Sequence, residues 1–288
     1  MKILVTGAGG MLGSEIIRKS ADKYKTDMPD VVLGVGHAEL DITDKRAVDE
    51  LVDSFGPDCI IDCAAYTAVD LAEDEHEKCY AVNVTATEYL AEAAERTGAS
   101  FIYVSTEYIF AGEGEAPYDI EAAAGPVNYY GMTKYLGERA AREKCSRCFI
   151  ARTSWTYGIN GKNFVKSMLN AAKTRTSVTV VDDQIGSPTY VSDVADFLLE
   201  LAKSDKYGIY HAVNSGYCSR YEMTKYLYGL MEVGTEVIPI KSSEYKAKAR
   251  RPLNCRLSQT GNIENGFTPL RTWKDALKEF CEMYGDRL

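Results

Sequence analysis

The sequence predicts an α/β fold, built on a doubly wound parallel sheet with a smaller C-terminal lobe. Three observations support this prediction. A short apolar run near the N-terminus leads directly into a cluster of glycines, short apolar runs then alternate regularly with amphipathic helical patterns, and the alternation becomes irregular after about residue 155. Strands that alternate with helices are joined by right-handed crossovers and form a parallel sheet with helices on both faces.

The first element is a strand, a glycine turn and a helix. Ile3–Val5 is long enough for a buried strand, and glycines follow at positions 7, 9, 10 and 13 around the start of a helical pattern at Met11. Gly7 permits a tight turn, Gly10 lets the backbone approach a pyrophosphate, and Gly13 lets helix and strand pack closely. The N–H groups of the helix N-terminus attract the anion. We therefore expect a Rossmann-type dinucleotide site rather than a purely structural turn.

The other elements of the core follow in order. Helices are predicted at Met11–Tyr24, from the capping residue Asp44 to Phe55, at Glu77–Thr97 and from Asn128 to about Lys144. Strands are predicted at Val31–Gly36, Cys59–Cys63, Phe101–Ser105 and Phe149–Thr153. Ligands of such sheets bind beyond the carboxyl ends of the strands, so the residues after each strand are the candidate site residues.

The C-terminal part alternates less regularly. Helices are expected at Phe164–Lys173, Val194–Lys203, Tyr221–Met231 and Thr272–Tyr284, an extended segment at Tyr207–Val213, and polar loops at Asp182–Thr189 and Lys246–Leu257. We expect residues 1–155, with returning segments, to form an NAD(P)-binding Rossmann core. Residues 156–288 are expected to form most of a substrate-binding lobe that closes over the cleft.

Composition excludes several classes of function. The net charge of −9 argues against a nucleic-acid or anionic-membrane partner, since both require a basic face. No apolar stretch approaches the ~18 residues of a membrane span, and no signal peptide is visible. The eight cysteines follow no disulfide spacing, and the lone pair Cys145 and Cys148 fits a helix end better than a zinc or redox site. With three histidines, no histidine metal cluster is expected, and the sequence predicts a reduced, cytoplasmic protein.

The adenosine end of the dinucleotide site leaves the cofactor open. The second strand ends at Gly36-His37 with neither the acid typical of NAD nor an arginine for a 2′-phosphate. Asp41 and Ile42 follow soon after and could line the adenine, although Asp41 fits a helix-entry turn equally well. After the third strand, the small side chains of Ala64 and Ala65 would let a flat cofactor lie against the backbone, or could simply pack under a helix.

A threonine, a tyrosine and a lysine are the candidate catalytic residues. Thr106 ends the fourth strand, and 24 residues later Tyr130 and Lys134 lie four apart at the start of a helix, on one face. A phenol has a pKa near 10, and a nearby ammonium lowers it toward the working range. Spacing alone favours a surface tyrosine beside a solvated lysine. The glycine loop and the position of Thr106 together favour an acid–base pair that acts on a carbonyl bound by Thr106.

Several longer runs carry a resemblance over nearly the whole chain. The pattern Thr6-Gly7-x-x-Gly10-x-x-Gly13 and the pair Tyr130 and Lys134 resemble the extended short-chain dehydrogenase/reductase superfamily. Within it, the chain resembles the dTDP-4-dehydrorhamnose reductase family. The longer matching runs lie at residues 64–70, 105–110, 152–155 and 183–189, with Arg251-Pro252 and Asn254 beyond them.

The resemblance implies reduction of the C4 ketone of a dTDP-linked 4-keto-6-deoxy sugar by NADPH or NADH, which gives dTDP-L-rhamnose. Tyr130 would protonate the alkoxide, Lys134 would hold the nicotinamide ribose and lower the pKa of Tyr130, and Thr106 would bind the carbonyl oxygen. The cofactor would further contact Gly10, Met11, Leu12, Asp41, Ile42, Ala64, Ala65 and Tyr66, and Glu107 and Trp155 would contact the substrate.

Two residues depart from the family pattern, and several properties stay open. The family usually has aspartate at the position of Glu107 and asparagine at that of Asp62. Some members bind Mg²⁺ at a dimer interface, but no motif here places such an ion or establishes a homodimer. Two other functions compete with the implied one: another nucleotide-sugar reductase or epimerase of the superfamily, and a non-catalytic regulatory subunit that binds a dinucleotide. An intact Thr106, Tyr130 and Lys134 argues against the second.

Overall fold

The computed structural model describes residues 1–22 and 30–287 of the chain. Its centre is a six-stranded sheet with the order β10-β5-β4-β3-β1-β2, in which every neighbouring pair is parallel. The strands are β1 (Lys2–Thr6), β2 (Val31–Val35), β3 (Cys59–Asp62), β4 (Ser100–Thr106), β5 (Cys148–Thr153) and β10 (Gly208–His211). The predicted doubly wound parallel sheet is confirmed.

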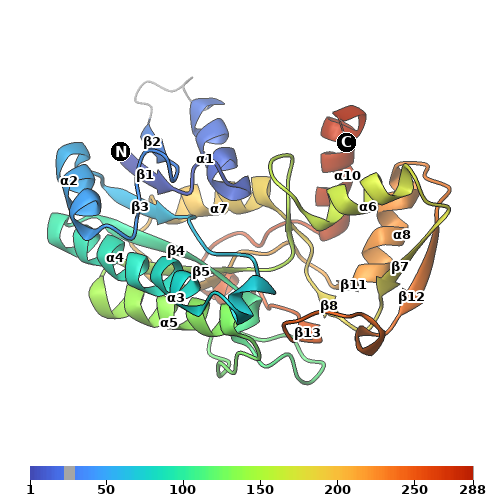
Figure 1. The fold of residues 1–288 in the computed structure, drawn as a ribbon. Coiled ribbons are helices and arrows are strands. Elements are labelled where there is room, and N and C mark those ends of the chain that lie inside the picture. Colours follow the sequence, from blue (N-terminus) through green and yellow to red (C-terminus); the bar gives the residue numbers. More distant parts are fainter. Residues whose placement is uncertain (23–29, 288) are drawn as a thin grey trace.

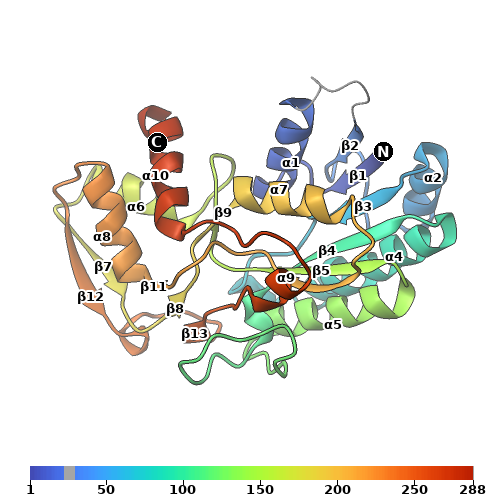
Figure 2. The ribbon, with the colours of Figure 1, turned by 180° about the vertical axis from the view of Figure 1, so that it is seen from behind.

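Helices cover both faces of this sheet (Figures 1 and 2). One face packs against α1 (Met11–Asp22) and α7 (Val191–Leu201), and the other against α2 (Lys45–Phe55), α4 (Ala86–Thr97) and α5 (Tyr129–Lys144). Alternate strand residues therefore enter different cores: Ile3 and Val5 lie in the first and Leu4 in the second. The predicted end of the first helix at Tyr24 lies outside the described residues.

The predicted caps hold, and one predicted helix is interrupted. The carboxylate of Asp44 accepts from the N–H groups of Arg46 and Ala47, and Gly56 and Gly98 end their helices with φ of +60° and +76°. The helix predicted at 77–97 is instead α3 (His76–Tyr80), a π-helical turn (Ala81–Thr85) and α4. The π turn contains the buried Asn83, whose amide oxygen accepts from the N–H of Tyr66 at 2.8 Å.

A second core lies in the C-terminal part. It is formed by α6 (Phe164–Ala172), α8 (Arg220–Leu230) and α10 (Trp273–Tyr284) around the parallel pair β7 (Ser177–Val181) and β12 (Glu236–Ile240). The sequence analysis missed this strand pair and the short α9 (Thr260–Glu264). Helix α7 begins three residues earlier than expected.

Short strands occupy the two segments that the sequence predicted as polar loops. The first contains β8 (Ile185–Gly186) and the start of β9 (Thr189–Tyr190), and the second contains β13 (Asn254–Cys255). Strand β8 lies between β11 (Cys218–Ser219) and β13, while β6 (Thr156–Tyr157) pairs with β9. These pairings join segments far apart in sequence, which local patterns cannot reveal. Single 3₁₀ turns occur at Leu71–Glu73, Glu107–Ile109, Ser242–Glu244 and Gly285–Arg287.

In the described part of the chain, no helix combines the length and apolarity that crossing a bilayer would require.

Candidate active site

A cleft of about 520 Å³ opens at the carboxyl end of the central sheet. It lies between the ends of β1, β3, β4 and β5 and the segments that lead into α6 and α8. Nine of the predicted site residues line it: Gly10, Met11, Leu12, Ala65, Thr106, Glu107, Tyr130, Lys134 and Trp155. The other six do not line it: Gly7, Gly13, Asp41, Ile42, Ala64 and Tyr66.

The glycine loop fits a bound dinucleotide. Gly7 adopts φ of +62°, and a side chain there would lie 2.7 Å from the backbone nitrogen of Ala64. A side chain on Gly13 would come within 2.3 Å of the carbonyl oxygen of Gly7. Both residues are therefore glycine because backbone packs against backbone behind the loop, as the sequence predicts. Helix α1 starts at Met11, and its first residues Met11 and Leu12 line the cleft, where the N-terminus of a helix attracts an anion.

An acidic side chain lies at the tip of β2 after all. The carboxylate of Glu39 turns back and accepts from the N–H of Gly36 at 2.8 Å. A side chain on Gly36 would lie 4.0 Å from the backbone nitrogen of Gly9, so this tip faces the glycine loop. The expectation that the tip lacks an acid was wrong, because the loop after β2 brings Glu39 back to the strand end.

Asp41 has the structural role that the sequence left open. Its carboxylate accepts from the N–H and the hydroxyl of Thr43, at 2.9 and 2.7 Å, and so fixes the turn before α2. Ile42 is buried in the core beneath that helix. Contact of either residue with an adenine stays a prediction.

Tyr66 turns its side chain away from the cleft. Its hydroxyl donates to Glu75 at 2.9 Å, and its ring packs beside Ala72 and Cys79. Ala64 lies behind the glycine loop, where its N–H donates to Asp62 at 3.2 Å. Of Ala64, Ala65 and Tyr66, only Ala65 lines the cleft.

Helix α5 positions Tyr130 and Lys134 through close packing at its start. The side chain of Asn128 caps the helix by accepting from the N–H of Gly131 at 2.8 Å, and its amide nitrogen donates to the carbonyl of Arg250 at 2.7 Å. A side chain on Gly131 would lie 2.2 Å from the carbonyl oxygen of Tyr108. This glycine therefore lets α5 approach the end of β4, which carries Thr106.

Lys134 is buried beneath the cleft. Its ammonium donates to the carbonyl of Val104 at 2.8 Å and lies 3.9 Å from the centre of the Tyr103 ring. Burial lowers the pKa of Lys134 to about 8, although the carboxylate of Asp62 opposes this shift. Lys134 is therefore a fixed ammonium rather than a solvated surface lysine, which the bare spacing favoured.

The pKa of Tyr130 differs from the expectation. Burial raises it above the usual phenol value, the charge of Glu107 raises it further, and a hydrogen bond with Thr106 opposes the rise. The sequence analysis expected Lys134 to lower this pKa. That expectation was wrong for the protein without ligands, because the ammonium donates to Val104 and burial outweighs other effects on the phenol.

Thr106 and Glu107 form a hydrogen-bonded pair at the end of β4. The hydroxyl of Thr106 donates to the carboxylate of Glu107 at 2.8 Å and accepts from the N–H of Tyr108 at 3.2 Å. Glu107 is only 3 % exposed. Burial raises its pKa to about 7, while Thr106 and the charge of Arg220 lower it.

Asp62 is a second buried carboxylate, and it lies close to Lys134. One of its oxygens accepts from the hydroxyl of Thr6 at 2.6 Å, and the other has no hydrogen-bond partner among the described residues. Burial raises the pKa of Asp62, while Thr6 and Lys134 lower it. The carboxylate thus ties the tip of β3 to that of β1 and places a negative charge near Lys134.

Trp155 is held in a strained backbone conformation. It adopts φ of +46°, which non-glycine residues rarely take. A side chain on Gly186 would lie 2.8 Å from the indole ring, so that glycine makes room for Trp155. Strand β8, which the sequence analysis did not predict, therefore contacts Trp155, a predicted substrate residue.

The sequence analysis missed several residues of the cleft. Among them are Ser105, Tyr108, Thr153, Ser154, Lys162, Asn163 and Arg220. Most follow predicted strands and could have been found by extending the search past each strand end. Arg220 lies in the C-terminal part and reaches the cleft only through tertiary packing. Among the described residues, no group of three or more His, Cys, Asp or Glu side chains could hold a metal ion.

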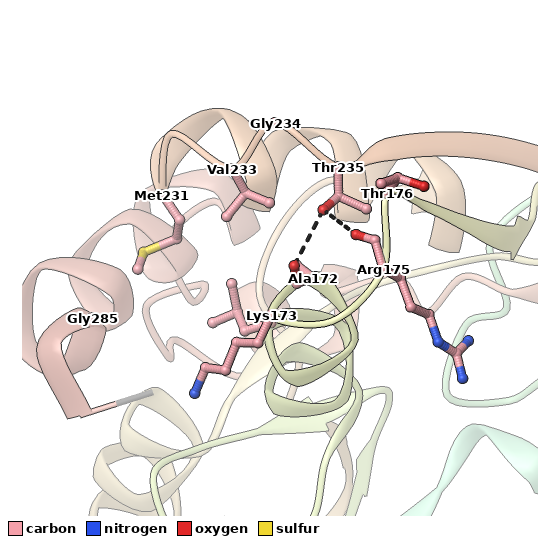
Figure 3. A pocket seen from close by; sticks show the side chains of 10 residues that line it. Ala172, Lys173, Arg175, Thr176, Met231, Val233, Gly234, Thr235 and Gly285 are labelled. Atoms are coloured by element: carbon pink, nitrogen blue, oxygen red, sulfur yellow. Dashed lines mark hydrogen bonds between the residues drawn. The ribbon is translucent and has the colours of Figure 1, made fainter.

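A second hollow lies away from this cleft, in the C-terminal part (Figure 3). It is lined by the end of α6 and the segment between α8 and β12, where the hydroxyl of Thr235 donates to the carbonyl of Arg175 at 3.0 Å. Apart from Lys173, Arg175 and two threonines its lining is apolar or glycine, and its described residues include no carboxylate or imidazole.

Comparisons with known proteins agree on one family. The model of the RmlD substrate binding domain matches residues 1–285. The chain is 38% identical to the spore coat polysaccharide biosynthesis protein SpsK of Bacillus subtilis (strain 168), over 98% of this chain and 97% of that protein. It is 39% identical to the dTDP-4-dehydrorhamnose reductase of Aggregatibacter actinomycetemcomitans, over 96% of this chain and 97% of the other.

A solved structure is similar along the full length. The crystal structure of dTDP-4-dehydrorhamnose reductase (rfbD) from Bacillus anthracis str. Ames in complex with NADP superposes with a TM-score of 0.93. The sequence identity is 36%, and the match covers 98% of this chain and 99% of that one.

Proposed function

Because the chain belongs to the RmlD substrate-binding-domain family, we propose that it is an NAD(P)H-dependent oxidoreductase of dTDP-rhamnose biosynthesis. It reduces the C4 ketone of dTDP-4-dehydro-L-rhamnose to the alcohol of dTDP-L-rhamnose. The observation that carries this proposal is the meeting of Thr106, Tyr130 and Lys134 in one cleft that begins at the glycine loop.

The glycine loop and the first turn of α1 would hold the cofactor's pyrophosphate through Gly10, Met11 and Leu12. Ala65 would lie along the cofactor, and Lys134 would hold the nicotinamide ribose. When bound, NAD(P)H supplies the hydride that adds to the ketone carbon. The relative from Bacillus anthracis carries NADP, which supports a nicotinamide cofactor here.

Side chains of the protein bind the ketone oxygen and supply the proton for the alcohol. Thr106 donates a hydrogen bond to the ketone oxygen and holds it toward the tyrosine. Tyr130 then gives its phenolic proton to the alkoxide that forms as the carbonyl is reduced. Burial keeps the phenol neutral beforehand, which suits Tyr130 to giving a proton to the alkoxide. Glu107 and Trp155 position the sugar.

The direct test is oxidation of NADPH or NADH, followed by the absorbance of the reduced nicotinamide, with dTDP-4-dehydrorhamnose as substrate. We expect turnover by the wild-type chain and a loss of at least ~10²-fold in kcat for Tyr130→Phe, since the ring stays and the proton is removed. Activity only on another nucleotide sugar would assign a different reductase or epimerase. Dinucleotide binding without any hydride transfer, together with a stoichiometric partner enzyme, would instead favour a regulatory subunit.

Four further properties remain predictions. They are the division into a core of residues 1–155 with returning segments and a lobe of 156–288, the choice between NADH and NADPH, a homodimer, and a cytoplasmic location. A requirement for Mg²⁺ has no support in the described residues. Activity assays with a chelator and sedimentation of the purified protein test the ion and the dimer.

A further inference from the structure

Arg220 brings a positive charge into the cleft that the proposed reaction does not use. It is the first residue of α8 and lines the same cavity as Thr106 and Tyr130. Its guanidinium carbon lies 3.7 Å from the centre of the Trp155 ring and 4.8 Å from that of Phe164. Among the described residues, the guanidinium has no hydrogen-bond or ion-pair partner.

Such an arrangement leaves the guanidinium able to bind a ligand. Arg220 is partly buried, and burial lowers its pKa, while the nearby Tyr108 and Glu107 oppose this shift. Stacking on the two rings compensates in part and also fixes the direction of the guanidinium. Its planar fork matches the oxygens of a phosphate or carboxylate, so a fixed and unpaired guanidinium in a ligand cleft indicates an anionic ligand.

The other positive groups of the cleft are engaged or exposed. The ammonium of Lys134 donates to Val104, and Lys162 is exposed to solvent. At the N-terminus of α8, a capping box occupies two N–H groups, because Ser219 accepts from the N–H of Glu222 at 3.0 Å and Glu222 accepts from that of Ser219 at 2.7 Å. The side chain of Arg220 is therefore the main candidate for binding an anion in this part of the cleft.

We propose that Arg220 binds the diphosphate of the nucleotide-sugar substrate, in a subsite separate from the glycine loop. The proposal rests on the proposed function. In that function the cleft binds two diphosphate groups, one in the cofactor and one in the nucleotide sugar. The glycine loop serves that of the cofactor. Arg220 lies against Trp155, the residue proposed to contact the sugar, and so stands where the group attached to that sugar must lie.

The test is calorimetric titration of the full chain with dTDP and, separately, with UDP. We expect Arg220→Met to weaken both nucleotides by about 10- to 100-fold, the range for hydrogen bonds to a charged group. The loss of affinity should be equal for dTDP and UDP, because Arg220 binds the diphosphate that they share and not the base. Arg220→Lys, which keeps the charge without the fork, is expected to fall between wild type and Arg220→Met.

Arg46→Met is the matched control, since Arg46 is an exposed arginine on α2, remote from the cleft. It is expected to bind dTDP within about twofold of wild type. NADPH affinity, measured by quenching of protein fluorescence, is expected to be unchanged in all variants. Folding is checked separately by the melting temperature, and Arg220→Gln replaces Arg220→Met if that variant does not fold.

Three results would overturn the proposal: wild-type affinity for dTDP in Arg220→Met, a selective loss of NADPH binding in that variant, or no binding of either nucleotide by the wild-type chain. A wild-type chain that binds dTDP through Arg220 but does not reduce dTDP-4-dehydrorhamnose would contradict the proposed function alone. Reduction of that sugar with no contribution from Arg220 would contradict this inference alone.

Discussion

The hydroxyl of Thr106 donates its single hydrogen to the carboxylate of Glu107 at 2.8 Å. The same hydroxyl is proposed to donate to the substrate ketone, and one hydrogen cannot serve both acceptors. When Glu107 is protonated it can donate to Thr106 instead, which frees the threonine hydrogen for the ketone. The protonation state of Glu107 therefore determines whether Thr106 is ready to bind substrate.

We expect this competition to appear in the pH dependence of activity. Because burial raises the pKa of Glu107 to about 7, kcat/KM should fall as the pH rises through about 7. Glu107→Gln keeps a permanent donor toward Thr106, so the decline of its kcat/KM should move from about pH 7 to about pH 8, where Lys134 loses its proton. The measurement is kcat/KM from pH 5 to pH 9 for both proteins. An unchanged limb in Glu107→Gln would assign the titration to another group.

Glu107 should also affect stability, with a defined sign. Its folded-state pKa of about 7 exceeds the ordinary value of 4.5, so the folded protein holds a proton that the unfolded chain releases between these values. Stability from this group is therefore complete below pH 4.5 and is lost as the pH rises to about 7. In urea unfolding at pH 5 and pH 8, the wild type should lose more stability than Glu107→Gln between the two pH values.

Glu39 is expected to set the choice of cofactor. Its carboxylate lies at the tip of β2 beside the glycine loop, where an acidic residue accepts from the ribose hydroxyls of NAD and repels a 2′-phosphate. We predict a higher kcat/KM with NADH than with NADPH. In Glu39→Gln the ratio should shift toward NADPH by about 10-fold, the size of one charged contact. If the ratio of kcat/KM for NADH to that for NADPH is the same in both proteins, the adenosine ribose does not contact Glu39.

Gly186→Ala should displace the indole ring of Trp155. The added methyl group would lie 2.8 Å from the indole ring and 3.0 Å from the side chain of Cys255, so the ring must move. We expect a rise in KM for the sugar of about 10-fold or more, without a change in cofactor affinity. Gly229→Ala, in α8 with no atom within 4 Å of the added group, is the control and should leave KM unchanged.

Asp62→Asn should change the alkaline limb of activity. The carboxylate of Asp62 raises the pKa of Lys134 against the effect of burial, and the net value is about 8. Removing this charge should lower the lysine pKa, so activity should decline at a lower pH in the variant than in wild type. Thr6 and Ala64 can still bond to the asparagine oxygen, and a normal melting temperature would separate this electrostatic effect from misfolding.

The sequence predicted local features well and distant pairings poorly. Asp44, Gly56 and Gly98 act through their immediate neighbours, so their roles at helix ends were readable from spacing. Residues 177–181 alternate as a strand should, yet their partner at 236–240 contains a proline and lies far along the chain. Arg220 carries no local signal for the cleft, because only the packing of α8 against Trp155 brings it there.

The sequence predicted that Tyr130 and Lys134 lie together, but it could not predict their pKa values. A motif places Tyr130 and Lys134 on one helix face, and the structure keeps them there. Their pKa values depend on burial and on the carboxylates of Glu107 and Asp62, which come from other strands. Spacing along one helix therefore could not reveal that burial dominates both groups.

The central sheet takes its edge strand β10 and one covering helix, α7, from the chain beyond residue 190. When the chain has been synthesised only as far as β5, one face of its sheet has α1 but lacks α7, and β5 is an open edge. Apolar side chains of this core, such as Ile3, Val5 and Phe149, stay partly exposed to water until α7 and β10 have been synthesised and have packed. The interval between these events is when the polypeptide is most exposed to aggregation, and a pause in translation shortly after residue 155 would lengthen it.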